Sequence, residues 1–278
     1  MGSPCELQLY APTPEFAQHI AQQISADIYR LEQKYSRYRS DSFLSKINQV
    51  ANVGGSIEID EETAGLLNYA QTCYELSDGL FDITSGILRR VWKFESNVLP
   101  NDQQIESLLQ KIGWQHLHTE NSKLTFSKAE MELDFGGIVK EYAADRAATL
   151  CLNAGISHGI VNLGGDIKII GSHPDGKAWR VGIQHPRDKM KIWKTLKLKT
   201  GALASSGDYE RYFLIDGVRY GHILNPKTGY PVQQLAAVSV VADLCVVAGS
   251  AATIAMLKEK NGEKWLKSLG LQHYVFKN

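Results

Sequence analysis

The second half of the chain is a succession of short strand-like segments with little between them but turns. β-Branched runs and period-two alternation occur in five places: residues 159–166, 179–186, 195–207, 211–224 and 236–242. Strands joined by short turns pair antiparallel, because parallel neighbours need a long crossover connection between them. The pattern therefore predicts a mostly antiparallel sheet and an α+β fold.

Helical periodicity surrounds these strands. Apolar residues recur every three or four positions over residues 14–35. Further helices are expected in four places: 61–76, 101–113, 138–154 and 248–258. We also expect a first strand near 5–11, a last strand near 273–278 and a hairpin over 124–137 that turns at Lys128 and Ala129. No repeat or linker divides the chain, so the sequence predicts one α+β domain over residues 1–278.

The charges of the chain balance. Its 278 residues hold 30 Lys and Arg against 30 Asp and Glu, which gives no indication of a nucleic-acid or membrane-surface partner. Cys73, Cys151 and Cys245 lie in apolar surroundings without metal-site spacing, which favours buried free thiols. The sequence as given shows no signal peptide, lipobox or membrane-spanning run. We therefore expect a cytoplasmic protein, although a truncated periplasmic lipoprotein would read the same way.

Three stretches combine glycine with a carboxylate at the end of a strand: residues 133–140, 161–171 and 204–213. Glycine lets a backbone approach a ligand closely and expose its N–H groups, although each stretch could also be only a tight turn. The first stretch leads into a helix and places Lys140 in its first turn, where a cation opposes the helix dipole. A bound phosphate would offset that cost. None of the three matches a dinucleotide-binding glycine fingerprint or a P-loop.

Three further polar residues stand in unusual settings. Tyr38 follows a helix and could belong to the core or stack on a planar ring. Asp82 lies between Phe81 and Ile83, where an acid costs energy unless it is paired. His222 ends a strand directly before a rigid Asn-Pro-Lys-Thr-Gly turn, so it is either a satisfied structural histidine or a functional one.

Together these stretches resemble, in order and over nearly the whole chain, the ApbE family of flavin transferases. The resemblance is carried by MGSPCELQLY, SRYRSDSFLSKIN, DGLFDITSGIL, LDFGGIVKEYAADRAA, VNLGGDIKIIG, SSGDYERYF, HILNPKTGYPV and AGSAATIAML. It implies a single T-fold-like domain that binds FAD in a cleft, with Mg²⁺ bridging the pyrophosphate. FMN would be attached through its phosphate to a threonine of an acceptor protein, and AMP would leave.

The resemblance also implies roles for individual residues. The flavin contacts of the family fall on eight positions: Met1, Tyr38, Leu80, Phe81, Asp82, Asp134, Lys140 and Ile223. The metal would be held by the backbone oxygen of Gly137 and by Thr253. His222 matches the general base, and Lys140 and Mg²⁺ could neutralise charge on the pyrophosphate. The acceptor pattern of the family does not occur in this chain, so the acceptor is expected to be another protein.

The chain departs from the family where the metal carboxylate is expected, because Gly249 stands there. Asp243 or Asp208 could substitute, the metal could be more hydrated, or the chain could bind FAD without turnover. Glu141 stands where the family usually has glycine and could supply the missing carboxylate, although its helix is expected to point the side chain away from the metal. Ile83 stands where proline is common in the family. The alternatives to a transferase are an FAD-binding protein, an FAD pyrophosphatase that makes FMN and AMP, and a non-catalytic scaffold.

Overall fold

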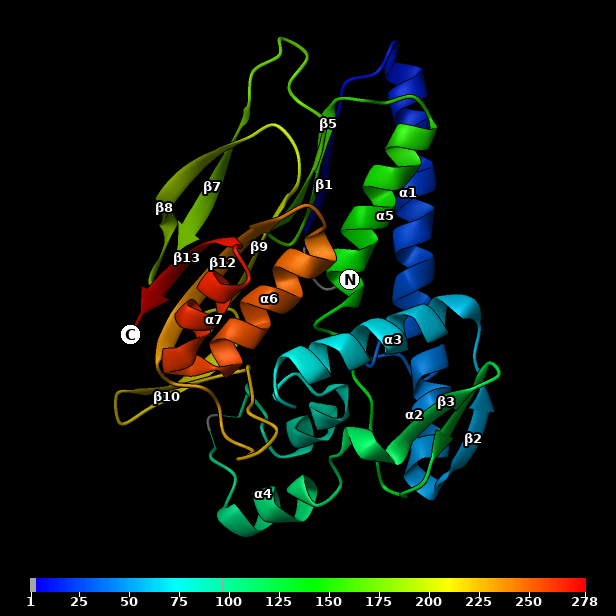
Figure 1. The fold of residues 1–278 in the computed structure, drawn as a ribbon, viewed down its shortest axis with the longest axis vertical. Helices are drawn as coiled ribbons and strands as arrows, with labels where there is room; N and C mark the ends of the chain where they lie inside the picture. The colour runs from blue at the N-terminus through cyan, green and yellow to red at the C-terminus, as the bar shows by residue number, and fades with distance from the viewer. Residues whose placement is uncertain (1–3, 97) are drawn as a thin grey trace.

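The computed structural model describes residues 4–96 and 98–278, and its centre is a sheet of antiparallel strands (Figure 1). The order across this sheet is β1 (Cys5–Leu9), β5 (Gly159–Leu163), β6 (Asp166–Ile170), β9 (Ala202–Gly207), β12 (Leu235–Ala242) and β13 (Gln272–Lys277). Each neighbouring pair is antiparallel. The predicted α+β class with a mostly antiparallel sheet is confirmed.

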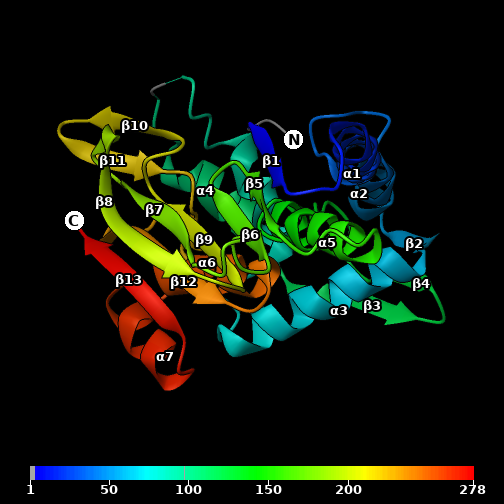
Figure 2. The same cartoon turned by 90° about the horizontal axis from the view of Figure 1, so that it is seen from above.

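Long helices cover one face of this sheet, as Figure 2 shows. They are α1 (Pro14–Tyr35), α5 (Val139–Asn153) and α6 (Cys245–Leu257). From Ala248 to Leu257, α6 buries every residue except Thr253, because β9 and β12 lie against it on one side and α5 on another. None of the described helices is both long and apolar enough to span a bilayer.

The opposite face is covered by a two-stranded hairpin. Its strands are β7 (Trp179–His185) and β8 (Asp188–Leu198). Strand β7 alternates buried and exposed residues, and Trp179, Val181 and Leu196 pack on Ile169 and Leu203 of the main sheet. The sheet therefore has an apolar layer on both faces, which accounts for the apolar runs in its central strands.

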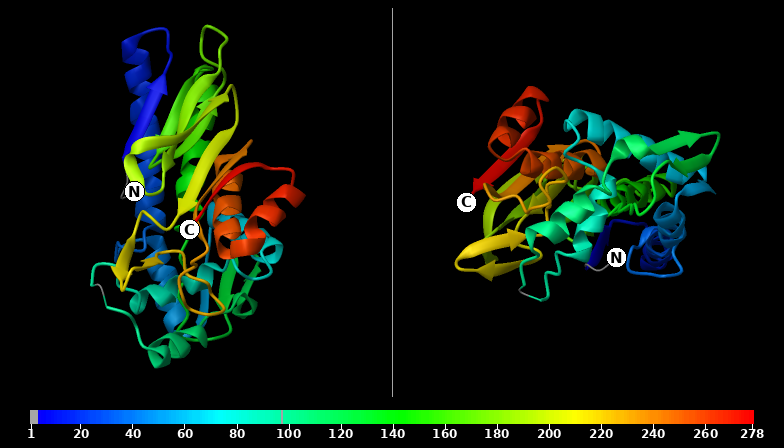
Figure 3. Two further views of the ribbon diagram at one scale, coloured as in Figure 1. Left: turned by 90° about the vertical axis from the view of Figure 1, so that its left-hand side faces the viewer. Right: turned by 90° about the horizontal axis from the view of Figure 1, so that it is seen from below.

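A second group of elements lies beyond the lower end of the sheet (Figure 3). Its helices are α2 (Phe43–Val53), α3 (Glu61–Leu76), η1 (Ile83–Arg90), α4 (Asp102–Leu109) and η2 (Trp114–His116). Its small sheet has the order β2 (Gly55–Glu58), β4 (Lys123–Phe126) and β3 (Leu117–Glu120). The hairpin of β10 (Tyr212–Ile215) and β11 (Val218–Gly221) contacts this group, because Phe213 stacks on Trp92. Two further elements follow α6 in the chain: η3 (Glu259–Asn261) and α7 (Gly262–Ser268).

The predicted hairpin over 124–137 is wrong in its second half. Strand β4 pairs with β2 and β3, whereas the extended segment after it has no partner strand among the described residues. Met131 and Leu133 are fully buried, so the alternation that suggested a strand is real. Their backbone is satisfied differently: Asn48 donates to the carbonyl of Leu133 at 3.0 Å and accepts its N–H at 2.7 Å. The Met131 N–H donates to the Ala51 carbonyl at 3.2 Å, so the Asn48 side chain and the end of α2 together replace a neighbouring strand.

Two helix boundaries also differ from the expectation. Helix α6 begins at Cys245 rather than near 248, because the Asp145 carboxylate of α5 accepts the N–H groups of Cys245 and Val246 at 2.8 and 2.9 Å. Helix α4 ends at Leu109 rather than near Gly113. The capping side chain of α6 lies 100 residues earlier in the chain, so local sequence could not reveal it.

Replacing Asn48 by alanine should destabilise the protein by about 2–3 kcal/mol, because a buried N–H and a buried C=O lose their partner together. Asn52→Ala makes the same change at an exposed position of α2 and should cost less than about 0.5 kcal/mol. Urea unfolding of both variants measures the difference. Equal losses would mean that Asn48 does not hold the buried segment.

Candidate functional site

An exposed tyrosine and several arginines from distant segments meet at one side of the molecule. Tyr38 follows α1 and keeps 71% of its surface accessible. Its hydroxyl accepts a hydrogen bond of 2.7 Å from Arg211, which precedes β10. The guanidinium carbons of Arg37 and Arg211 each lie 5.9 Å from the centre of the ring. The arrangement leaves a flat aromatic surface free between two cations.

Asp134 organises the same region from the segment before α5. Its carboxylate accepts from Arg37 at 2.8 Å and from the Gly136 N–H at 2.8 Å, and Arg89 approaches to 3.7 Å. Burial alone would raise the pKa of Asp134, but Arg89 and Arg37 outweigh it and the pKa is lowered. A Cβ at Gly86 would stand 2.6 Å from the Asp134 Cβ, so glycine is required there. Asp134 therefore stays ionised and fixes two arginines.

His222 stands directly after β11 and before a closed turn. The turn is held by the Asn225 carboxamide, which accepts the Lys227 N–H at 2.9 Å, and by the bridge between Leu224 and Pro231. The Nδ1 atom of His222 is buried and has no hydrogen-bond partner in the described structure.

The electrostatic surroundings of His222 keep its ring neutral. Burial lowers its pKa to about 4, and the positive charges of Arg89, Arg211 and Lys140 act in the same direction. The imidazole is therefore uncharged at neutral pH and has a nitrogen lone pair available. Arg37, Arg89 and Arg211, called here the arginine group, and Lys140 belong to different segments, and the charges of Arg89, Arg211 and Lys140 all act on the His222 ring.

A second charged cluster lies at the first turn of α5. The Lys140 ammonium pairs with Asp166 of β6 and lies 3.7 Å from Oε1 of Glu141. The other oxygen of Asp166 accepts the Ser205 N–H at 3.1 Å. Burial, followed by the charge of Asp166, raises the pKa of Glu141, and Lys140 opposes this shift. Two buried carboxylates thus share one ammonium group.

Glu141 points toward α6, contrary to the expectation that its helix would turn it away. A Cβ built on Gly249 would stand 2.5 Å from Cγ and 3.0 Å from Cδ of Glu141. The glutamate side chain therefore fills the space in front of residue 249. One turn along the same helix, the Thr253 hydroxyl bonds to Ser206 of β9 at 2.7 Å. Gly137, four residues before Glu141, packs on Phe81, whose Cζ would lie 3.3 Å from an added Cβ.

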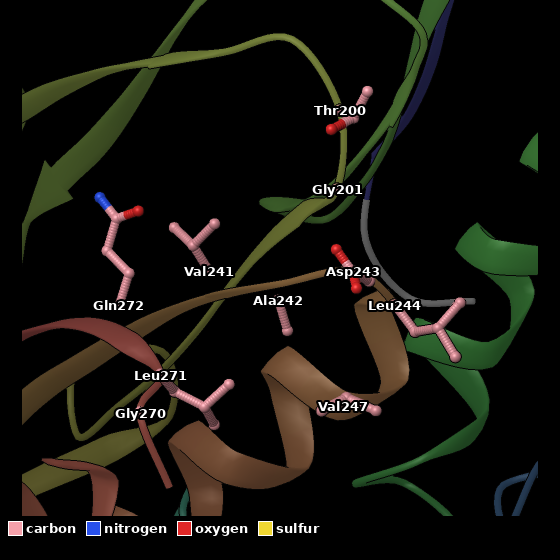
Figure 4. Close-up of a pocket in the computed structure, with 10 residues that line it drawn as sticks. All are labelled: Thr200, Gly201, Val241, Ala242, Asp243, Leu244, Val247, Gly270, Leu271 and Gln272. Carbon is pink, nitrogen blue, oxygen red and sulfur yellow. The ribbon is translucent and has the colours of Figure 1, made fainter.

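The two other acids considered for the metal are placed elsewhere. Asp208 is buried in a two-pronged ion pair with Arg187, with distances of 2.6 and 2.8 Å. Asp243 is exposed ahead of α6, six residues before Gly249 in the chain. It lines an open hollow of about 460 Å³ together with Thr200, Leu244 and Gln272 (Figure 4). Of the acids considered, Glu141 alone contacts the volume beside Gly249.

The remaining predicted site residues include apolar wall residues and a cap. Phe81 and Ile223 are buried and Leu80 is half-buried. Asp82 accepts the Thr84 N–H at 2.8 Å and its hydroxyl at 2.7 Å, so it caps η1, and burial raises its pKa. Met1 lies outside the described residues. Sequence reasoning missed Arg89, Arg211 and Asp166 as members of these clusters, because their partners are distant in the chain.

The fold is that of solved flavin transferases. The ApbE protein of Thermotoga maritima superposes with a TM-score of 0.88 at 33% identity, covering 99% of this chain and 91% of that one. The flavinyl transferase ApbE of Pseudomonas stutzeri gives 0.88 at 27% identity, covering 99% and 88%. A FAD:protein FMN transferase of Vibrio cholerae is 32% identical over 234 residues, 82% of this chain and 70% of the relative. The chain belongs to the ApbE family, whose model matches residues 1–275.

Adding an acid at Gly249 alone should destabilise the protein by about 2–4 kcal/mol, because the new side chain overlaps Glu141 and adds a third buried carboxylate. Gly65→Asp is the matched control, since Gly65 lies within α3 with no atom within 4 Å of its added Cβ. Thermal or urea unfolding compares them, and equal stabilities would show that α5 and α6 have room for both acids.

His222 should remain neutral well below the usual histidine range. NMR of its ring nitrogens should give a pKa below 5, which rises when inorganic pyrophosphate offsets the nearby cations. An unfolded imidazole protonates near pH 6.5, so this group stabilises the fold fully above that pH and loses its contribution as pH falls toward about 4. His222→Asn should weaken that acid sensitivity. A measured pKa near 6.5 in the free protein would contradict the enclosed environment.

Proposed function

We propose that this chain is a Mg²⁺-dependent FAD:protein FMN transferase that attaches FMN through its phosphate to a threonine of another protein and releases AMP. The observation that carries the proposal is the neutral His222, with a partnerless ring nitrogen, beside a group of cations. Family membership and the names of the relatives support the same reaction.

The arrangement of charges fits a dinucleotide pyrophosphate. Arg37, Arg89 and Arg211 converge from three segments, and the charge of Lys140, in the first turn of α5, acts on the same His222 ring as Arg89 and Arg211. Arginine presents several N–H donors in a plane that matches phosphate oxygens. The N-terminus of α5 has no side-chain cap, and although the Phe135 carbonyl accepts the Val139 N–H, the helix dipole still favours an anion at this end.

The flavin ring system fits the exposed face of Tyr38. A planar aromatic ligand gains from offset stacking and from the two guanidinium groups beside the tyrosine. Phe81 and Ile223 are available as apolar wall residues. The adenosine end would then extend away from Tyr38, past the arginine group.

The proposed reaction needs one proton transfer from the acceptor. The threonine hydroxyl attacks the FMN phosphorus, His222 takes its proton at Nδ1, and a new P–O bond forms as the bond to the AMP phosphate breaks. Lys140 and the arginines balance negative charge on the phosphates. Mg²⁺, when bound, would supply further charge neutralisation, and the Gly137 carbonyl, the Thr253 hydroxyl and a nearby carboxylate are the groups that would hold it.

His222→Ala should lower FMN transfer by roughly 10²–10⁴-fold while FAD affinity stays within about threefold, since the base acts on the acceptor and not on flavin binding. The assay combines covalent flavin fluorescence of an acceptor domain with AMP release. AMP released without acceptor would instead favour an FAD pyrophosphatase. Transfer at the wild-type rate would remove His222 from the mechanism.

Tyr38→Ala should weaken FAD binding by about 5–20-fold, and Tyr38→Phe should recover most of the loss because the ring is kept. Tyr29→Ala on α1, where the tyrosine is also exposed, is the matched control and should leave FAD affinity unchanged. Quenching of flavin fluorescence measures all three. Equal affinities for wild type and Tyr38→Ala would place the flavin elsewhere.

A further inference from the structure

Glu141 is a buried acid with one oxygen unused. Only 7% of the residue is accessible, and its Oε2 atom has no hydrogen-bond partner within the described part of the chain. Asp166, which is 2% accessible, is the neighbouring acid. The Lys140 ammonium is committed to Asp166 and stands 3.7 Å from the other oxygen, Oε1, of Glu141. A buried carboxylate oxygen left without a partner is costly, so the cluster is suited to one more cation.

The missing side chain at Gly249 leaves the space that the Glu141 side chain occupies. Any side chain at 249 would overlap Cγ of Glu141, so the glutamate carboxyl group takes the place that an acid on α6 would use. The other oxygen groups expected around the metal lie on the same two segments. Gly137 lies just before α5, four residues ahead of Glu141, and Thr253 is one turn after Gly249 on α6.

We propose that Glu141 provides the carboxylate ligand of the divalent cation in this chain, so that the acid comes from α5 instead of α6. The inference rests on the proposed function and deepens it. Mg²⁺ is commonly held by one or two carboxylates together with substrate phosphates and water, so one glutamate with a hydroxyl and a carbonyl is a sufficient protein contribution.

A proton shared between Glu141 and Asp166 is the competing explanation for their closeness. The variant Glu141→Gln distinguishes the two explanations. Glutamine has the shape of a protonated glutamate and can donate a hydrogen bond as that acid would, but it carries no negative charge. Titration calorimetry of Mg²⁺ into the full chain, with and without FAD, should show at least a tenfold loss of affinity in this variant. Glu106→Gln, an exposed change on α4, should leave the affinity unchanged. Undiminished Mg²⁺ binding by Glu141→Gln would overturn the proposal.

The double exchange E141G/G249D is the second test. It removes the glutamate, frees the space beside residue 249 and places an aspartate on α6. Mg²⁺ affinity should fall in E141G by at least tenfold and return to within about threefold of wild type in the double variant. A folded double variant that does not recover affinity would show that the two positions are not equivalent, and would overturn the inference.

Failure of the inference and failure of the proposed function give different results. Mg²⁺ binding that depends on Glu141, without FMN transfer, supports the metal assignment and counts against the transferase. FMN transfer with Mg²⁺ affinity unaffected by Glu141→Gln keeps the transferase and removes Glu141. Absence of saturable Mg²⁺ binding by the wild-type chain, both with and without FAD, overturns the inference.

Discussion

The site depends first on the contact between the Asp145 carboxylate and the start of α6. By accepting the N–H groups of Cys245 and Val246, Asp145 fixes the register of α5 against α6. Glu141 lies one turn before Asp145 and Gly249 one turn after Cys245, so the same register brings Glu141 opposite Gly249. Small residues along both helices allow this close approach. One capping interaction therefore places a buried acid on the face of a neighbouring helix.

The arginine group also depends on one buried carboxylate. Asp134 holds Arg37 and Arg89 near each other in a largely buried setting, where like charges would otherwise separate. Burial of the His222 ring, together with the charges of Arg89, Arg211 and Lys140, keeps that ring neutral. An anion entering this space would meet cations already in position and a base whose proton affinity rises as the anion binds. Anion binding and the basicity of His222 are then linked through the same positive charges.

The fold was largely predictable because periodicity reports which residues face the core. The antiparallel strands β5 to β12 and helices α1, α3 and α5 all have such patterns. The segment around Leu133 has the alternation of a strand but has no partner strand among the described residues. Alternation indicates which side chains are buried, but it does not indicate whether the backbone bonds to another strand or, as at Leu133, to the side chain of Asn48.

The site was predictable only in part, for a related reason. Glycine-rich turns, Lys140 and His222 are visible in the sequence, and the family resemblance ordered them. The direction of Glu141 depends on the register between two helices about a hundred residues apart, and the partners of Arg89 and Arg211 depend on how separate segments fold together. Local sequence carries no information on these distances.

The shared space of Glu141 and residue 249 also limits how such a site can change through mutation. Two acids cannot occupy it together without overlap, and an empty space leaves no carboxylate. A chain that moves its acid between the helices must therefore pass through a form that is crowded or a form that has lost the acid. The two positions are therefore epistatic: the effect of a glycine at position 249 on the site depends on which residue stands at position 141.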